Sequence, residues 1–416
     1  MKVIVAHPGT QHSFRVAKAL KDAGLLFKYA TTVYNKDHSL LMRFVKLFLG
    51  KDNFARAQRR KCLSLVDDDV IQFCELEGLL LLALIRLDKS TKLSKAYNGY
   101  ISKKFQQKLA KYIINEHVDA VISYDTNSEI LFGILKEYAP NVVRIMDHAA
   151  PNRHYMYKCY HQYWDTCGEF VNTLQVYKFI MNESLSEKYI KEILLAHYHI
   201  VASSFSRDAV VYEGVNEKSV FLVPYGADEK FFVESERKFS NELIKVLFVG
   251  KINQQKGIAQ VLDAAKFINS KNVKFEIIGP GIEFCKDLYE PYKEYVTFRG
   301  FMLHEALLEH MKNSHVFVFP TMGEGFGLVL FETMAAGLVP ITTRNCGGGD
   351  IVEDGVNGFL VEVGDTSAIV EKILWCKEHP VELATMSQKA IETARQFTWD
   401  RYEKGIVEVV LNVAKK

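Results

Sequence analysis

A predicted strand and a predicted helix are joined by Phe319-Pro-Thr-Met-Gly-Glu-Gly-Phe-Gly-Leu-Val-Leu-Phe-Glu-Thr-Met-Ala-Ala-Gly-Leu-Val-Pro340. The strand ends at Pro320, and the helix begins near Gly327. Glycines between them allow tight turns and a close approach of the backbone. The first N–H groups of a helix and its dipole favour an anion such as a diphosphate. The segment therefore predicts an α/β fold with an anion site at the edge of a sheet.

Two glutamates accompany the predicted anion site. Glu324 lies in the glycine-rich loop, and Glu332 follows eight residues later, inside the helix. A carboxylate beside a phosphate is unfavourable for the anion, so we expect both glutamates to accept hydrogen bonds from hydroxyl groups. One set of hydroxyls would belong to a ribose and the other to a sugar. The alternative is an ordinary glycine-rich turn that carries a glutamate at the surface.

The segment belongs to a series of alternating strands and helices, which predicts a doubly wound parallel sheet over residues 240–395. A charged stretch, Tyr225–Glu242, interrupts the pattern and marks the boundary with an earlier domain. The expected strands of the second domain are Val246–Val249, Phe275–Ile278, Val296–Phe298, Val316–Phe319 and Val339–Thr342.

Residues 1–225 show a second alternating series and predict another Rossmann-like domain, interrupted by a helical insertion at about 36–112. Two such domains that face each other leave a cleft lined by the carboxyl ends of both sheets. Ligands of open α/β sheets bind at the carboxyl ends of the strands, so we expect the site in this cleft. The expected helices are Gln11–Ala23 and Glu129–Tyr138. The expected strands are Lys2–Ala6, Val118–Tyr124, Val142–Asp147, His199–Ser203 and Val220–Pro224.

Several ordered motifs of the second half resemble those of the retaining nucleotide-sugar glycosyltransferases of family 4, whose fold is GT-B. The E-x7-E signature of that family is matched by Glu324 and Glu332. A final segment, Phe397–Tyr402, is similar to the family's closing motif, which implies that residues 396–416 form a helix crossing back to the first domain. The other matching segments are Phe248–Gly257, Ile278–Gly281, Val296–Phe301, Cys346–Val352 and Asp354–Phe359.

The resemblance implies roles for the matching residues of the second domain. Lys251 and Lys256 would pair with the donor diphosphate and help the nucleotide to leave, as a fixed positive charge does where negative charge develops. Glu332 would bind the ribose, and Glu324 the transferred sugar. Backbone amides would complete the donor site, those of Gly325, Phe326 and Gly327 facing the sugar and those of Leu328 and Val329 facing the phosphates.

The first domain resembles the family less closely. Gly9 is the one glycine left in the loop after the first strand to approach a phosphate. His148 ends a strand where many relatives carry a histidine that touches the transferred sugar, although a structural histidine would fit there too. His12 and Asp125, at or beyond other strand ends, are weaker candidates. Asp350 departs from the family pattern and receives no role.

These observations predict an enzyme that moves a sugar from a nucleotide-sugar to a glycan or lipid-linked saccharide and retains the anomeric configuration. The nucleotide-sugar is a co-substrate, and the resemblance implies no metal or other cofactor. One alternative is a sugar-nucleotide 2-epimerase of the same fold. Another is a non-catalytic nucleotide-sugar-binding protein, which the presence of all four charged site residues disfavours.

Composition excludes several other classes of protein. The 416 residues are 48% hydrophobic and 25% charged, as in ordinary globular domains. Seven scattered cysteines without a C-x-x-C pair indicate a reducing compartment, and Cys159, His161 and Cys167 lack the second pair of a zinc site. Asp67–Asp69 could bind a metal, as in GT-A enzymes, but no strand series precedes it, so an acidic helix start is favoured.

Charge is unevenly distributed along the chain. Residues 1–225 carry 30 basic and 23 acidic side chains, whereas residues 226–416 carry 22 and 27. Much of the basic excess lies in 41–61, which predicts either contact with an anionic membrane surface or a solvated helical face. No nucleic-acid motif accompanies it. Without a signal peptide, and with no apolar run longer than Leu79–Ile85, we expect a cytoplasmic protein, peripheral on the inner membrane face if 41–61 binds lipid.

Overall fold

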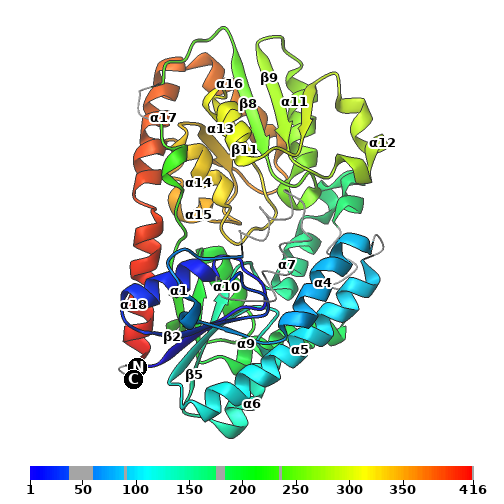
Figure 1. Ribbon diagram of the computed structural model, residues 1–416. Helices are drawn as coiled ribbons and strands as arrows, with labels where there is room; N and C mark the ends of the chain where they lie inside the picture. Colours follow the sequence, from blue (N-terminus) through cyan, green and yellow to red (C-terminus); the bar gives the residue numbers. More distant parts are fainter. Residues whose placement is uncertain (37–59, 89–90, 175–182, 234–236, 415–416) are drawn as a thin grey trace.

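The computed structural model describes residues 1–36, 60–88, 91–174, 183–233 and 237–414. Figure 1 shows two α/β units stacked along the long axis of the molecule, with two helices running down one side of both. Each unit is built on a parallel sheet, as the alternating sequence pattern predicts. The basic segment 41–61 lies almost entirely outside the described residues.

The first sheet has seven strands in the order β3-β2-β1-β4-β5-β6-β7. Its central strands are buried along their whole length, as expected for parallel strands covered on both faces. The strands are β1 (Val3–Ala6), β2 (Leu26–Thr31), β3 (Val70–Gln72), β4 (Ala120–Tyr124), β5 (Val143–His148), β6 (Tyr198–Val201) and β7 (Val220–Leu222).

Two helices of the first unit begin with a side-chain cap. Asn152 accepts a hydrogen bond from the Tyr155 N–H group, and Ser203 accepts one from the Ser206 N–H group. The helices are α1 (Ser13–Asp22), α4 (Glu75–Leu87), α5 (Lys92–Asn115), α6 (Glu129–Tyr138), α7 (Arg153–Gln162), α9 (Glu183–Leu195) and α10 (Ser204–Val211).

The segment 36–112 differs from the expected helical insertion. It supplies α4 and most of α5, but it also contributes the edge strand β3, which pairs with β2. Neither strand is among those expected from the sequence. For β3 the reason is its length, because three residues carry too little pattern to recognise. Asp67–Asp69 form a 3-10 helix directly before β3, in line with the acidic helix start that the sequence favours.

The second sheet has six strands in the order β10-β9-β8-β11-β12-β13. All five expected strands are present, and the two-residue edge strand β13 (Phe359–Leu360) is added. The other strands are β8 (Ile244–Val249), β9 (Val273–Ile278), β10 (Val296–Gly300), β11 (Val316–Phe319) and β12 (Val339–Thr342). The helices are α11 (Ile258–Ile268), α12 (Lys286–Tyr289), α13 (His304–Lys312), α14 (Leu328–Ala335), α15 (Gly348–Ile351), α16 (Thr366–Glu378) and α17 (Pro380–Arg395).

Two glycines allow the loops at the carboxyl edge of this sheet to pack closely. Gly279 has a φ of +150°, and a Cβ atom there would lie 1.8 Å from the Gly250 carbonyl oxygen. Gly257 has a φ of +72°, and its Cβ atom would lie 2.2 Å from the Pro320 carbonyl oxygen. Because both positions exclude a side chain, the loops after β8, β9 and β11 converge at one edge of the sheet.

Helix α18 (Trp399–Ala414) returns to the first unit and packs against α1. Glu403 accepts a hydrogen bond from Lys18, and the Trp399 indole N–H donates to Asp228 at 2.9 Å. Figure 1 shows that this return brings the chain ends together. One hydrophobic cluster contains residues of both sheets and of α18. Within the described ranges, no helix is long and apolar enough to cross a bilayer.

Candidate functional site

The start of α14 presents unbonded backbone donors at the carboxyl edge of the second sheet. Gly327 precedes the helix with a φ of +82°, and its carbonyl accepts the Leu330 N–H group at 2.8 Å. The amides of Leu328 and Val329 have no acceptor among the residues that the structure describes. Two free amides at the positive end of a helix dipole form an anion site.

Beside these amides, Lys256 and Glu324 form an ion pair. Lys256 ends a short 3-10 helix after β8, Gln254–Lys256, whose start is capped by the Asn253 side chain. The loop that carries Glu324 is bonded to the same turn, because the Met322 N–H group donates to the Gln255 carbonyl at 2.8 Å. Two separate loops thus place a cation and a carboxylate next to the free helix start.

The ammonium group of Lys256 is largely buried. Burial lowers the pKa of Lys256 to about 8, the nearby Lys251 lowers the pKa further, and Cys346 opposes the shift. The paired carboxylate of Glu324 also favours the charged form of the lysine. Lys251 itself is exposed at the end of β8. A desolvated cation in this place gains from the arrival of a diphosphate, which would replace its missing water.

Glu332 lies farther along α14 and faces the segment that links the two units. Burial raises the pKa of Glu332 to about 7; Asp228 raises the pKa further, and Lys230 opposes the shift. At neutral pH the carboxyl group is therefore present in both protonation states and can either accept or donate a hydrogen bond. Both properties suit a partner that carries hydroxyl groups.

Gly325 makes the closest approach of this loop to the first unit. A Cβ atom on Gly325 would lie 2.5 Å from the Ala149 carbonyl oxygen. The Gly325 carbonyl accepts hydrogen bonds from the hydroxyls of Ser203 and, at 3.1 Å, of Ser206. The glycine loop is therefore held against β5 and α10, and glycine is required at this position by the space.

Asp350 makes a second contact between the units, which the sequence does not predict. Its carboxylate accepts a hydrogen bond from the Ser204 N–H group at 2.8 Å, at the start of α10. A negative charge at a helix N-terminus is stabilising. The serine pattern around Ser203 signals a helix start in the sequence, but nothing local indicates that a carboxylate from the other unit completes it.

Phe326 contributes to the site through its backbone, because its side chain is buried. Its ring stacks on Phe331 with the centroids 4.1 Å apart and meets Tyr225 edge to face. Its carbonyl accepts a hydrogen bond from the Gly347 N–H group at 2.9 Å. The packing of this ring fixes the loop between Glu324 and α14.

His148 is buried at the end of β5, directly before the residues that meet Gly325. Its Nε2 atom lies 3.0 Å from Nδ1 of His199. Burial lowers the pKa of His148 well below the usual value, and His199 lowers it further. The ring is therefore neutral at physiological pH, so any contact with a substrate would be a hydrogen bond without charge.

A cavity of about 170 Å³ lies next to His148, at the carboxyl ends of β4 and β5. Burial raises the pKa of Asp125 to about 6 and the pKa of Glu192 to about 7. Glu192 accepts hydrogen bonds from the Thr126 and Ser128 N–H groups and so occupies the start of α6. Of the candidates in the first unit, Asp125 and His148 are thus brought together.

Gly9 and His12 both lie in the loop after β1, but each bonds to a different residue. The Gly9 N–H group donates to Nδ1 of His7 at 2.8 Å, so this amide is already bonded. His12 Nε2 lies 2.8 Å from an oxygen of the buried Asp147. Burial alone would lower the pKa of His12. The negative charge of Asp147 outweighs burial, and Asp125 adds to its effect, so the pKa of His12 is raised above 6.5.

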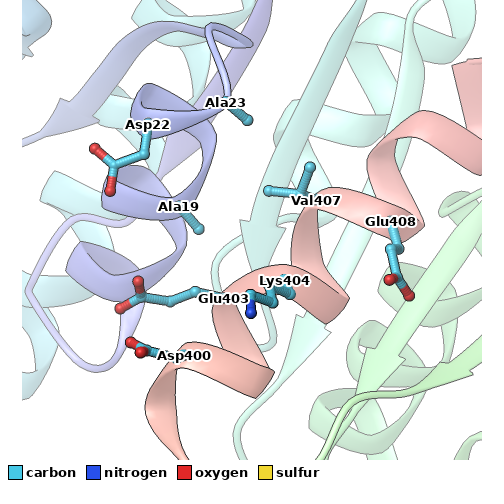
Figure 2. Close-up of a pocket in the computed structure, with 8 residues that line it drawn as sticks. All are labelled: Ala19, Asp22, Ala23, Asp400, Glu403, Lys404, Val407 and Glu408. Atoms are coloured by element: carbon cyan, nitrogen blue, oxygen red, sulfur yellow. The ribbon is translucent and has the colours of Figure 1, made fainter.

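A larger groove of about 460 Å³ lies between α1 and α18, away from these residues. Figure 2 shows side chains of both helices around it, and none is a candidate site residue. Over the described ranges, no cluster of three or more histidine, cysteine, aspartate or glutamate side chains could hold a metal ion. The lining residues are Ala19, Asp22, Ala23, Asp400, Glu403, Lys404, Val407 and Glu408.

Residues 244–379 match the family described as Glycosyl transferases group 1. The chain is 30% identical over 213 residues to an uncharacterized glycosyltransferase of Methanocaldococcus jannaschii, covering 49% of this chain and 53% of that protein. It is 32% identical over 203 residues to CapM of Staphylococcus aureus, a capsular polysaccharide biosynthesis glycosyltransferase, covering 46% and 50% of the two chains. The chain thus aligns with about half the length of these relatives.

Solved structures show the same overall architecture at low sequence identity. Sucrose-phosphate synthase of Thermosynechococcus elongatus has a TM-score of 0.65 at 16% identity, covering 100% of this chain and 99% of that one. HepE of Anabaena, solved in complex with UDP, has a TM-score of 0.64 at 16% identity, covering 99% and 100%. The two units with their crossing helix therefore form a GT-B fold.

Proposed function

We propose that the protein transfers a sugar from a nucleotide-sugar donor to an acceptor, on the premise that residues 244–379 match the family described as Glycosyl transferases group 1. The observation that carries the proposal is the Lys256–Glu324 ion pair beside the two free amides of α14. The proposal is supported by the names of relatives in polysaccharide synthesis and by a UDP complex of a protein with the same fold.

In the proposed complex, the diphosphate lies at the start of α14. Its oxygens accept hydrogen bonds from the amides of Leu328 and Val329, and Lys256 moves from Glu324 to the phosphate. Lys251 adds a second positive charge. The freed carboxylate of Glu324 then accepts hydrogen bonds from the transferred sugar, and Glu332 bonds the ribose hydroxyls.

We propose that transfer retains the anomeric configuration and needs no bound metal. The lysines stabilise the charge that develops on the leaving phosphate, which is the role that a metal plays in other transferases. As the bond between the sugar and the phosphate breaks, the acceptor oxygen forms its bond on the same face. The leaving phosphate takes the proton of the acceptor. Closure of the two units would exclude water and suppress hydrolysis.

The proposed acceptor is a glycan or a lipid-linked saccharide that enters along the first unit. His148 and Gly325 mark the place where the acceptor side meets the donor loop. A cytoplasmic location on the inner membrane face is part of this proposal. The candidate membrane segment 41–61 lies almost wholly outside the described residues.

The test is release of nucleotide from UDP-, GDP- and ADP-sugars by the purified protein. Glu324→Ala and Lys256→Ala should each lower turnover at least about a hundredfold, as loss of one transition-state contact does. Lys389→Ala and Glu392→Ala are matched controls, because these residues form an exposed ion pair on α17 and are not among the proposed site residues. Turnover unchanged by the first two variants would contradict the proposed site.

Product analysis separates the alternatives. A 2-epimerase would convert the nucleotide-sugar into its epimer without any acceptor, and a binding protein would release nothing while still binding nucleotide. Addition of EDTA tests metal independence, and turnover should remain unchanged. The anomeric configuration of the product, read from its NMR coupling constant, tests retention.

A further inference from the structure

Helix α4 exposes a row of apolar side chains. Leu76, Leu80, Ala83 and Leu87 are spaced so that they lie on one side of the helix, and all four are exposed. Leu76 is 67% exposed, Leu80 51% and Leu87 78%. We call these four residues the leucine stripe. A surface helix of a soluble protein normally turns its apolar side inward, so the stripe reverses the usual pattern.

The opposite side of α4 explains why the stripe faces outward. Gly78 is the only buried residue of this helix, and a Cβ atom there would lie 2.7 Å from a methyl group of Val33. Glu77 on α4 forms an ion pair with Lys104 on α5. These contacts fix the rotation of α4, so the stripe cannot turn inward without the loss of both.

Further apolar side chains are exposed on α5, the helix that packs against α4. They are Leu93 and Tyr100. Soluble proteins rarely expose apolar side chains in such a concentration, and a patch of this kind marks a site of interaction with a protein or a membrane.

The positive charge of α5 favours an anionic partner. Residues 92–115 contain six lysines and no acidic residue. Lys92 and Lys95 are exposed on either side of the exposed Leu93. Two copies of this surface would repel each other, whereas an anionic lipid surface attracts the lysines and accepts the leucines. Figure 1 shows α4 and α5 side by side, on the side of the first sheet opposite α18.

We propose that α4 and α5 dock this protein on an anionic lipid bilayer. The leucine stripe enters the boundary between headgroups and acyl chains, and Lys92 and Lys95 of α5 lie on the headgroups. The inference does not depend on the proposed transferase activity, since it assigns lipid binding to described residues outside the donor site and outside 41–61.

The test is sedimentation of the full-length protein with vesicles of phosphatidylcholine alone or with added phosphatidylglycerol. The protein should bind only the anionic vesicles, and less strongly at high salt. The triple variant Leu76→Ser, Leu80→Ser, Leu87→Ser should bind at least about tenfold less strongly, because burial of the leucine side chains in the bilayer stabilises the bound state. Lys92→Gln with Lys95→Gln should weaken binding about 25-fold, at about fivefold for each charge.

Phe267→Ser and Val381→Ser are the matched controls, because these side chains are 77% and 74% exposed on the second unit. They should leave vesicle binding unchanged. The inference is overturned if the wild-type protein ignores anionic vesicles, if the triple variant binds as well as the wild type, or if the controls lose as much binding. Dimerisation that the triple variant abolishes, without any lipid binding, would also overturn it. An unchanged thermal melt shows that the triple variant is folded.

Discussion

Lys256 combines burial with an ionic partner, and its protonation state limits what the donor site can do. Burial lowers the pKa of Lys256 to about 8, so the ammonium group loses its proton as the pH rises through that value. A neutral lysine cannot stabilise the charge on a leaving phosphate.

We therefore expect kcat/KM for the donor to fall as the pH rises above about 8. Lys256→Arg should remove this fall, because a guanidinium stays protonated, although a changed geometry should lower the rate itself about tenfold or more. The measurement is a profile of nucleotide release from pH 6 to 10. A wild-type profile that stays flat across pH 8, or one identical in shape to that of the arginine variant, would contradict the role of this lysine.

His12 links stability to pH through the buried Asp147. Its pKa is raised above 6.5 in the folded protein, since the aspartate outweighs the effect of burial. A raised pKa means that the folded state binds the proton more tightly, so the stabilisation is complete below pH 6.5 and is lost as the pH rises through the folded value.

Urea unfolding of the wild type and of His12→Gln should show this difference. Between pH 6 and pH 9, the wild type should lose more free energy of unfolding than the variant, because the variant lacks the titrating group. Other buried acids titrate in both proteins, so only the difference between the two slopes tests the pair. Equal slopes would show that His12 and Asp147 are not coupled.

At the scale of elements, the start of α10 is completed by a residue of the other unit. Asp350 accepts a hydrogen bond from the Ser204 N–H group, while Ser203 bonds the Gly325 carbonyl in the donor loop. The helix start therefore couples the position of the donor loop to the contact between the units.

Asp350→Ala should lower the free energy of unfolding by about 1 kcal/mol, as loss of a helix cap does. It should also raise KM for the donor, because the glycine loop loses part of its support. Asp365→Ala is the matched control: Asp365 caps α16 through the Ala368 N–H group within the second unit. The control should show a similar loss of stability with KM unchanged. An equal rise in KM for both variants would mean that the effect is general destabilisation.

Local sequence patterns predict the longer elements of the fold but not the shortest strands. The five longer strands of the second sheet and the start of α14 follow from local residues: apolar runs, glycines and a helix pattern. The edge strands β3 and β13, of three and two residues, do not, because their pairing depends on a neighbour already in place.

At the scale of the whole molecule, the two units share one core. Tyr225 lies between them, 5.3 Å from the Phe326 ring and 5.4 Å from the Tyr402 ring of α18. The cluster that contains these residues also contains members of both sheets. Because the core is continuous, unfolding of one unit would expose part of the other.

We expect a single cooperative unfolding transition in urea, with coincident midpoints by tryptophan fluorescence and far-UV circular dichroism. Tyr402→Ala should cost about 3–5 kcal/mol, in the range of aromatic truncations in a core. Two separate transitions in the wild type would show that the units are stabilised independently and that the shared cluster contributes little.

The sequence by itself determined the alternation of strands and helices, the glycine loop and the two glutamates of the donor side. These features depend on residues close together in the chain, where periodicity and backbone freedom act. Only the tertiary structure decided that Lys256 pairs with Glu324, that Asp350 caps a helix 146 residues away, and that His12 meets Asp147 across 135 residues. It also decided which side of α4 faces outward. Such contacts depend on how distant elements pack, and no local pattern in the chain carries that information.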